Sequence, residues 1–180
     1  EVSRYETAET FWRVLRLVER RQGVDLTARM GEPTAYGDVE AQHEDAVEAV
    51  VNAYTLMEGF PGGATGGRFY GHRGTTRYEL AWMLHRLMIR AEAKKVAVTG
   101  RGPSLTYTDI PQGHWSGAIL HDLTQKFGLL IGFPDYTYRG ERPLTRYEMA
   151  IAMNACLANL LDKQLAPAAA VAAKPTPKPA

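Results

Sequence analysis

The chain has 180 residues, of which 45% are hydrophobic and 23% charged, so it can bury the core of one or two compact units. Its formal net charge of +1 gives no basic excess that would indicate nucleic-acid binding and no acidic excess typical of a polyanionic tail. A single cysteine, Cys156, excludes an internal disulfide, and no apolar run approaches the ~18 residues of a membrane span.

The first predicted helix begins with the sequence "SRYE" at residues 3–6. Apolar residues then recur with helical spacing at Ala8, Phe11, Leu15 and Val18, which is typical of an amphipathic helix. The related sequence "TRYE" at 76–79 and at 145–148 also precedes an apolar stripe. These later stripes are Leu80, Leu84, Leu87, Met88 and Ala91, and then Met149, Met153, Leu157 and Leu160. Three amphipathic helices are therefore predicted, each starting at the repeated tetrapeptide.

Each tetrapeptide has the form of a capping box. In this motif the N-cap hydroxyl accepts a hydrogen bond from the N3 amide, and the N3 glutamate accepts one from the N-cap amide. The predicted N-caps are Ser3, Thr76 and Thr145, and the predicted N3 glutamates are Glu6, Glu79 and Glu148. Losing such a cap costs ~0.5–2 kcal/mol. Because capping occupies these glutamates, they are poor candidates for general acids.

Two longer stretches between these helices also match each other. "YGDVEAQHEDAVEAVVNAYTLMEGFP" and "YTDIPQGHWSGAILHDLTQKFGLLIGFP" share aromatic-x-Asp, a histidine seven residues after the aromatic residue, a helical segment and Gly-Phe-Pro. The helices are expected at about 43–57 and 114–127. The chain therefore holds two whole repeats and the end of another. The predicted segments are the closing helix of a partial first repeat (1–22), a connector (23–35), a second repeat (36–92), a connector (93–106), a third repeat (107–163) and an Ala/Pro/Lys-rich tail or linker (164–180).

An arginine at N1 of each predicted helix needs an explanation. A cation there faces the positive end of the helix dipole, which costs ~0.3–1 kcal/mol unless something compensates. One explanation is a salt bridge to an aspartate such as Asp38 or Asp109. The other is an anion site, in which the arginine and the free helix-terminal amides bind a carboxylate or phosphate. The sequence alone leaves both explanations open.

The third repeat resembles the S-layer homology (SLH) repeat. The segments "YTDIPQGHW", "GLLIGFPDYTY" and "PLTRYEMAIAM" occur in order and at suitable spacing between residues 107 and 162. Residues 36–92 match more loosely, and residues 2–20 resemble a closing helix alone. The combination of elements is specific, although each element by itself is weak.

The resemblance implies an all-α fold of tandem helix-loop-helix repeats, packed as a pseudo-threefold helical bundle with grooves between repeats. It also implies a non-catalytic anchor that binds an anionic wall polymer, for example a pyruvylated polysaccharide, or modified peptidoglycan. The residues implied to bind the glycan are Arg146, Asp109, Trp115, Gly132, Asp135, Arg77, Asp38 and Arg4. The second repeat has Glu44 and Gly62 where the third has Trp115 and Asp135, so its groove is expected to be degenerate.

A second function remains open, in which the same fold serves protein contacts in an envelope or surface-layer assembly or in a homo-oligomer. No GxSxG, HExxH, P-loop or GxGxxG motif indicates an enzyme, and neither a metal nor a cofactor is expected. Trp12 and Trp82 are interpreted as boundary packing or a subunit contact in preference to ligand stacking. The chain starts at Glu1 rather than at methionine, so we expect a signal peptide or a larger upstream portion to precede it. The SLH resemblance implies an exported protein of the cell envelope.

Overall fold

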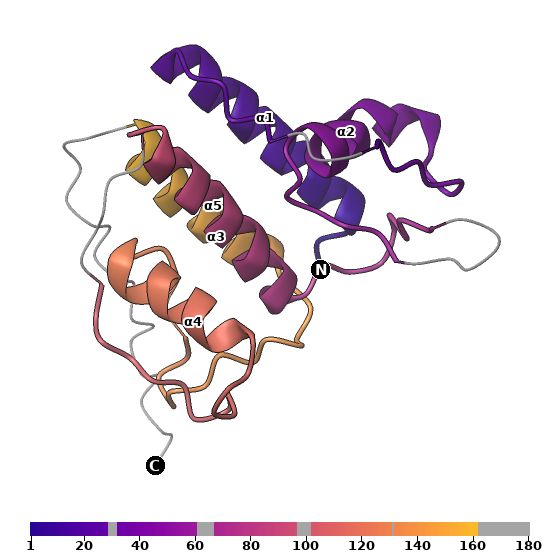
Figure 1. Ribbon diagram of the computed structural model, residues 1–180. Helices are drawn as coiled ribbons and strands as arrows, with labels where there is room; N and C mark the ends of the chain where they lie inside the picture. Colours follow the sequence, from indigo (N-terminus) through magenta and orange to yellow (C-terminus); the bar gives the residue numbers. More distant parts are fainter. Residues whose placement is uncertain (29–31, 61–66, 97–101, 131, 162–180) are drawn as a thin grey trace.

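The computed structural model describes residues 1–28, 32–60, 67–96, 102–130 and 132–161, and within these ranges it contains helices and no β-sheet (Figure 1). The elements are α1 (Arg4–Gln22), η1 (Ala41–His43), α2 (Glu44–Glu48), η2 (Ala49–Ala53), α3 (Arg77–Ala93), α4 (Ser116–His121), η4 (Asp122–Lys126) and α5 (Arg146–Leu161). The predicted all-α class is confirmed. The predicted tail at 164–180 lies outside the described residues.

The three long helices α1, α3 and α5 begin where the tetrapeptides predict. The Ser3 hydroxyl accepts from the Glu6 amide at 3.1 Å, and the Glu6 carboxylate accepts from the Ser3 amide at 2.8 Å. The same reciprocal pair joins Thr76 to Glu79 and Thr145 to Glu148. All three predicted capping boxes are therefore present.

The starts of these three helices meet at one end of the molecule. Three residues that directly precede the N-caps form a closed cycle of backbone hydrogen bonds, which we call the backbone ring. Val2 donates to Leu144 at 3.0 Å, Leu144 donates to Thr75 at 2.8 Å, and Thr75 donates to Val2 at 2.8 Å. The repeated tetrapeptides, far apart in the chain, are thus brought side by side.

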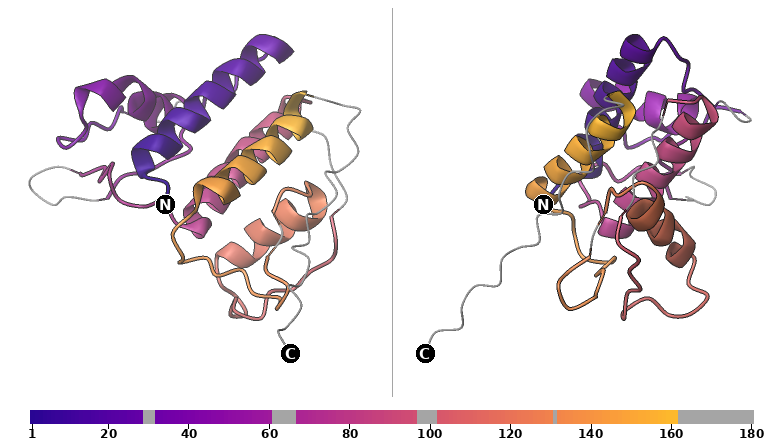
Figure 2. Two further views of the ribbon diagram at one scale, coloured as in Figure 1. Left: turned by 180° about the vertical axis from the view of Figure 1, so that it is seen from behind. Right: turned by 90° about the vertical axis from the view of Figure 1, so that its left-hand side faces the viewer.

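The two short helical segments are close to their predicted positions but differ in geometry. Each begins as α-helix, α2 or α4, and ends as a π-helical turn, η2 or η4. The wider turns are closed by hydrogen bonds from Tyr54 N to Ala49 O at 2.8 Å and from Phe127 N to Asp122 O at 3.0 Å. α2 packs against α1, and α4 packs against α3 (Figures 1 and 2).

The core includes the stripes that the sequence predicts. Ala8, Phe11, Leu15, Leu84 and Leu87 are fully buried, and the α5 stripe joins the same cluster. Cys156 is also fully buried, as expected, and burial raises the pKa of its thiol to about 12. Over the described part of the chain, no helix is both long enough and apolar enough to cross a membrane.

Candidate functional site

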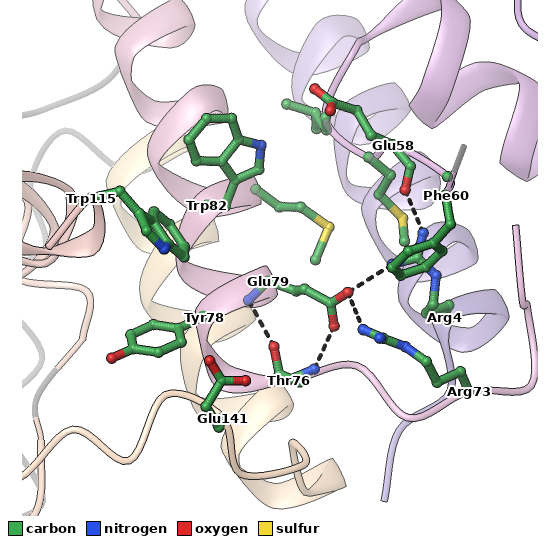
Figure 3. A pocket seen from close by; sticks show the side chains of 14 residues that line it. Arg4, Glu58, Phe60, Arg73, Thr76, Tyr78, Glu79, Trp82, Trp115 and Glu141 are labelled. Carbon is green, nitrogen blue, oxygen red and sulfur yellow. Dashed lines mark hydrogen bonds and ion pairs between the residues drawn. The ribbon is translucent and has the colours of Figure 1, made fainter. Parts of the chain in front are cut away.

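A pocket of about 370 Å³ lies beside the start of α3 (Figure 3). Its lining comes from α1, from the loop of the second repeat, from α3, and from the third repeat. It therefore lies between segments that the sequence analysis assigns to different predicted repeats. We call it the first pocket.

The buried side of the first pocket is formed by Arg4, whose side chain is 3% exposed. Its guanidinium donates to the Phe69 carbonyl at 2.9 Å, to the Glu58 carbonyl at 2.5 Å and to the Glu79 carboxylate at 2.9 Å. It also lies 4.7 Å from the centre of the Phe69 ring. Burial lowers the pKa of Arg4, and the nearby Glu79 opposes that shift. Arg4 is thus a fixed cation held by several groups.

The ion-pair partner of each tetrapeptide arginine is the capping glutamate of another tetrapeptide. Arg4 pairs with Glu79, and Arg77 pairs with Glu148 at 2.7 Å. The third pair is Arg146 with Glu6. The backbone ring explains this order, because it brings the N3 glutamate of one helix next to the N1 arginine of its neighbour. The internal acid that compensates each arginine is therefore a glutamate, and the sequence-based proposal of Asp38 or Asp109 is corrected.

Those two aspartates shape the loops of their own repeats. Asp38 accepts from the backbone amides of Phe69 and Tyr70 at 2.7 and 2.9 Å. Asp109 accepts from the amides of Tyr138 and Arg139, both at 2.7 Å. The repeated aromatic-x-Asp sequence thus fixes the loop that leads to the following tetrapeptide.

Gly132 and Asp135 also belong to the loop of the third repeat. A Cβ atom at Gly132 would lie 2.3 Å from the ring of Tyr107, so only glycine fits there without a shift. Asp135 accepts from Thr137 Oγ1 at 2.5 Å and from Arg139 at 2.6 Å. These hydrogen bonds lower the pKa of Asp135 to about 2. Both residues support the loop conformation.

Aromatic side chains form one wall of the first pocket (Figure 3). The rings of Trp82 and Trp115 lie 5.9 Å apart and nearly perpendicular, at 78°. Tyr78 lies 5.4 Å from Trp115. The two tryptophans are 38% and 51% exposed, which is unusual for large aromatic side chains without a partner. Together they make an aromatic corner that is open to solvent.

The charges around the first pocket do not favour an anion. Its lining contains the arginines Arg4 and Arg73 and the glutamates Glu58, Glu79 and Glu141. Arg73, with a side chain 43% exposed, is the more accessible of these two cations, and it also pairs with Glu79. A bound acid would have to compete with this glutamate for Arg73.

The predicted site residues are only partly brought together. Arg4 and Trp115 line the first pocket, whereas Arg146 lies at a different helix start and pairs with Glu6. Arg77 is buried against Tyr138, whose carbonyl accepts from it at 2.9 Å. Gly62, one of the departures in the second repeat, lies outside the described residues. Trp82 and Arg73 were not among the predicted site residues. A tryptophan one turn after Tyr78 is the signal in the sequence that could have found this wall.

The start of α5 is less covered than the starts of α1 and α3. The Tyr5 and Tyr78 rings lie against Gly71 and Gly140, where a Cβ atom would come within 2.1 Å of either ring. The corresponding Tyr147 is 70% exposed, and Ile151 one turn later is 44% exposed. This face of α5, with Arg146 beside it, is accessible to a partner.

Within the described ranges, no group of His, Cys, Asp and Glu side chains could hold a metal ion. The histidines instead bond to nearby side chains. His43 contacts Glu9 at 2.8 Å, and His114 contacts Ser116 at 2.8 Å.

Comparisons with known proteins find partial relatives. No protein-family model and no solved structure matches the chain. The chain is similar to proteins of the bacterial envelope. It is 45% identical over 56 residues to outer membrane protein SlpA of Deinococcus radiodurans, and 38% identical over 60 residues to outer membrane protein alpha of Thermotoga maritima. It is 27% identical over 113 residues to a cellulosome-anchoring protein of Acetivibrio thermocellus.

The matched segments are 31%, 33% and 62% of this chain, respectively. They are only 4%, 15% and 23% of these relatives. The likeness thus concerns a module that is small compared with the proteins that contain it.

Proposed function

We propose that this chain is a non-catalytic module that anchors its parent protein in the cell envelope by binding a wall glycan in the first pocket. The carrying observation is the open corner of Trp82 and Trp115 in the same pocket as the paired Arg73 and Glu79. Aromatic faces bury the apolar faces of sugar rings, while charged groups at the edge of a pocket exchange hydrogen bonds with the sugar hydroxyl groups. Partial relatives named as outer-membrane and anchoring proteins support an envelope location.

The SLH resemblance adds a finer proposal, namely that the glycan carries an acidic group such as a pyruvyl substituent. Of the arginines that line the first pocket or start a long helix, two are accessible enough to meet it. Arg73 lies in the first pocket with a side chain 43% exposed, and Arg146 lies at the start of α5 with a side chain 79% exposed. Each already pairs with a capping glutamate, so an acid would have to displace or share that partner.

Co-sedimentation of the purified chain with isolated cell walls tests the anchoring function. We expect Trp82→Ala and Trp115→Ala each to weaken binding by about tenfold, which corresponds to ~1.4 kcal/mol and is within the range for losing one aromatic contact. The matched control is Tyr136→Ala, which removes an aromatic residue that is 59% exposed and does not line the first pocket. Unchanged binding of both tryptophan variants, with helical content intact, would refute the proposed site.

The acidic group is tested separately with Arg73→Gln and Arg146→Ala and with walls whose acidic substituents have been removed. Loss of binding in only one of the two variants identifies which arginine meets the acid. Full binding to acid-free walls would refute the acidic ligand and leave a neutral glycan.

The alternative function, a scaffold for protein contacts, is favoured by the accessible face of α5. Tyr147 and Ile151 form an apolar surface beside Arg146. In this case Tyr147→Ala with Ile151→Glu should abolish association with envelope proteins or self-association, measured by cross-linking, while wall binding stays unchanged. The opposite pattern would support the glycan anchor alone.

A further inference from the structure

A second hollow of about 410 Å³ adjoins the first pocket. Both hollows are lined by Met57 and Glu58, so the second begins where the first ends. The remaining walls of this second pocket come from residues 32–36, from the helical segment of the second repeat and from Arg86 on α3. The two pockets therefore lie next to each other along the second repeat and share part of one wall.

Arg86 and Glu58 form the partition between the two pockets. The guanidinium of Arg86 lies 5.2 Å from the centre of the Trp82 ring, and its Nη1 atom is 3.0 Å from Glu58 Oε1. The Glu58 side chain is 73% exposed, and ion pairs at such accessible positions contribute little to stability. The partition can therefore rearrange around a bound chain at low cost.

The far wall of the second pocket is already fixed without a ligand. Thr34 donates from its amide to Asn52 Oδ1 at 2.9 Å, and the Asn52 side chain donates back to the Thr34 carbonyl at 3.1 Å. The Tyr36 hydroxyl accepts from the Gly59 amide at 2.7 Å. Binding in this pocket would thus require little ordering of the protein.

The second pocket has the opposite charge preference to an acid-binding site. Its charged lining residues are Glu32, Glu48, Glu58 and Arg86. Three carboxylates against one guanidinium repel an acidic substituent and attract an amine. The hydroxyl and amide groups of Thr34, Asn52 and Thr55 offer hydrogen bonds to a polar ring.

We propose that the second pocket is a subsite for the next sugar unit of the same glycan, and that this unit is an amino sugar without an acidic group. The proposal rests on the proposed function, because the neighbouring unit lies in the aromatic corner of the first pocket. The two pockets then select the order of two adjacent sugar units in a polymer. One unit stacks on the tryptophans of the first pocket, and the amine of the next unit binds the carboxylates of the second pocket.

Chain-length dependence tests this subsite. The probes are glucosamine oligosaccharides of one to four units, each in a free-amine and in an N-acetylated form, with binding to the full chain measured by calorimetry at neutral pH. We expect the free-amine dimer to bind at least tenfold more tightly than the free-amine monomer. The N-acetylated dimer should gain much less affinity over the N-acetylated monomer. Equal affinities for monomer and dimer in both forms would overturn the subsite.

A charge-reversed variant identifies the pocket responsible. Glu32 and Glu48 are exposed, so Glu32→Lys with Glu48→Lys should fold normally. We expect this variant to lose the gain in affinity from monomer to free-amine dimer and to keep its affinity for the N-acetylated monomer, which has no free amine. The control is Glu44→Lys with Asp45→Lys, which reverses two exposed acids that do not line either pocket. A gain that survives the first variant would overturn the proposal.

Failure here differs from failure of the anchoring function. Sedimentation with walls that depends on Trp82 and Trp115, combined with no length dependence, removes the second subsite alone. Sedimentation independent of both tryptophans removes the first pocket, and with it the basis of the subsite.

Discussion

The ion pair between Arg4 and Glu79 allows a quantitative test, because the chain contains an exposed version of the same pair. Glu79→Gln removes the charge but keeps a capping box, since glutamine can also reach back to the N-cap amide. Arg4 stays buried, with a side chain 3% exposed, and loses its carboxylate, and the more exposed Arg73 loses the same partner. Breaking a buried pair from one side costs ~3–5 kcal/mol, and because the amide can still accept a hydrogen bond we expect about 2 kcal/mol.

Glu6→Gln is the matched control for this change. Glu6 has the same place in its capping box, but its partner Arg146 has a side chain 79% exposed. Exposed pairs contribute ~0–1 kcal/mol, so we expect a loss of about 0.5 kcal/mol.

Urea unfolding followed by circular dichroism measures both variants. With a slope of ~1–3 kcal/mol per molar urea, Glu79→Gln should lower the midpoint by about 1 M and Glu6→Gln by a few tenths. Equal shifts would refute the reasoning, because they would mean that burial of the arginine has no effect on the strength of its pair.

Three further outcomes follow from burial and close contacts. Burial opposes ionisation of Glu148, but hydrogen bonds from Thr145 and two nearby arginines outweigh it and lower the pKa of this carboxyl group. Its stabilising contribution is therefore present at neutral pH and is lost as pH falls through the folded pKa. Glu148→Gln should flatten the loss of thermal stability below about pH 4.5. Gly132→Ala should cost ~1–3 kcal/mol in urea unfolding because its Cβ would meet the Tyr107 ring, whereas Gly117→Ala, with nothing within 4 Å in α4, should be neutral or stabilising. The Cys156 thiol, fully buried with a raised pKa, should react with a thiol reagent only as fast as the chain unfolds, and immediate reaction in native buffer would contradict its burial.

Local features of the fold could be predicted from the sequence. A capping box involves only residues three positions apart, and an apolar stripe reports one helix face, so Ser3, Thr76 and Thr145 and the stripes after them were identified without a structure. The π-helical turns at η2 and η4 were not, because they depend on how Tyr54 and Phe127 pack after their helices end.

Long-range partners could not be read from the sequence in the same way. The sequence correctly indicates that the arginine at N1 needs compensation, but it leaves open whether the acid is an internal aspartate, such as Asp38 or Asp109, or a bound anion. The actual partner lies on another long helix, and that neighbourhood exists only once the backbone ring has formed. The same holds for Trp82, whose open face becomes a pocket wall only when Trp115 of the third repeat lies beside it.

The backbone ring also bears on how the module would carry load. In open repeat arrays each unit contacts only its neighbours, so unravelling can start at either end. Here the residue before the N-cap of each long helix, Val2, Thr75 or Leu144, is hydrogen-bonded to the residues before the other two. Under tension the three helices should yield together in one abrupt step, a property that would suit the anchoring function proposed above.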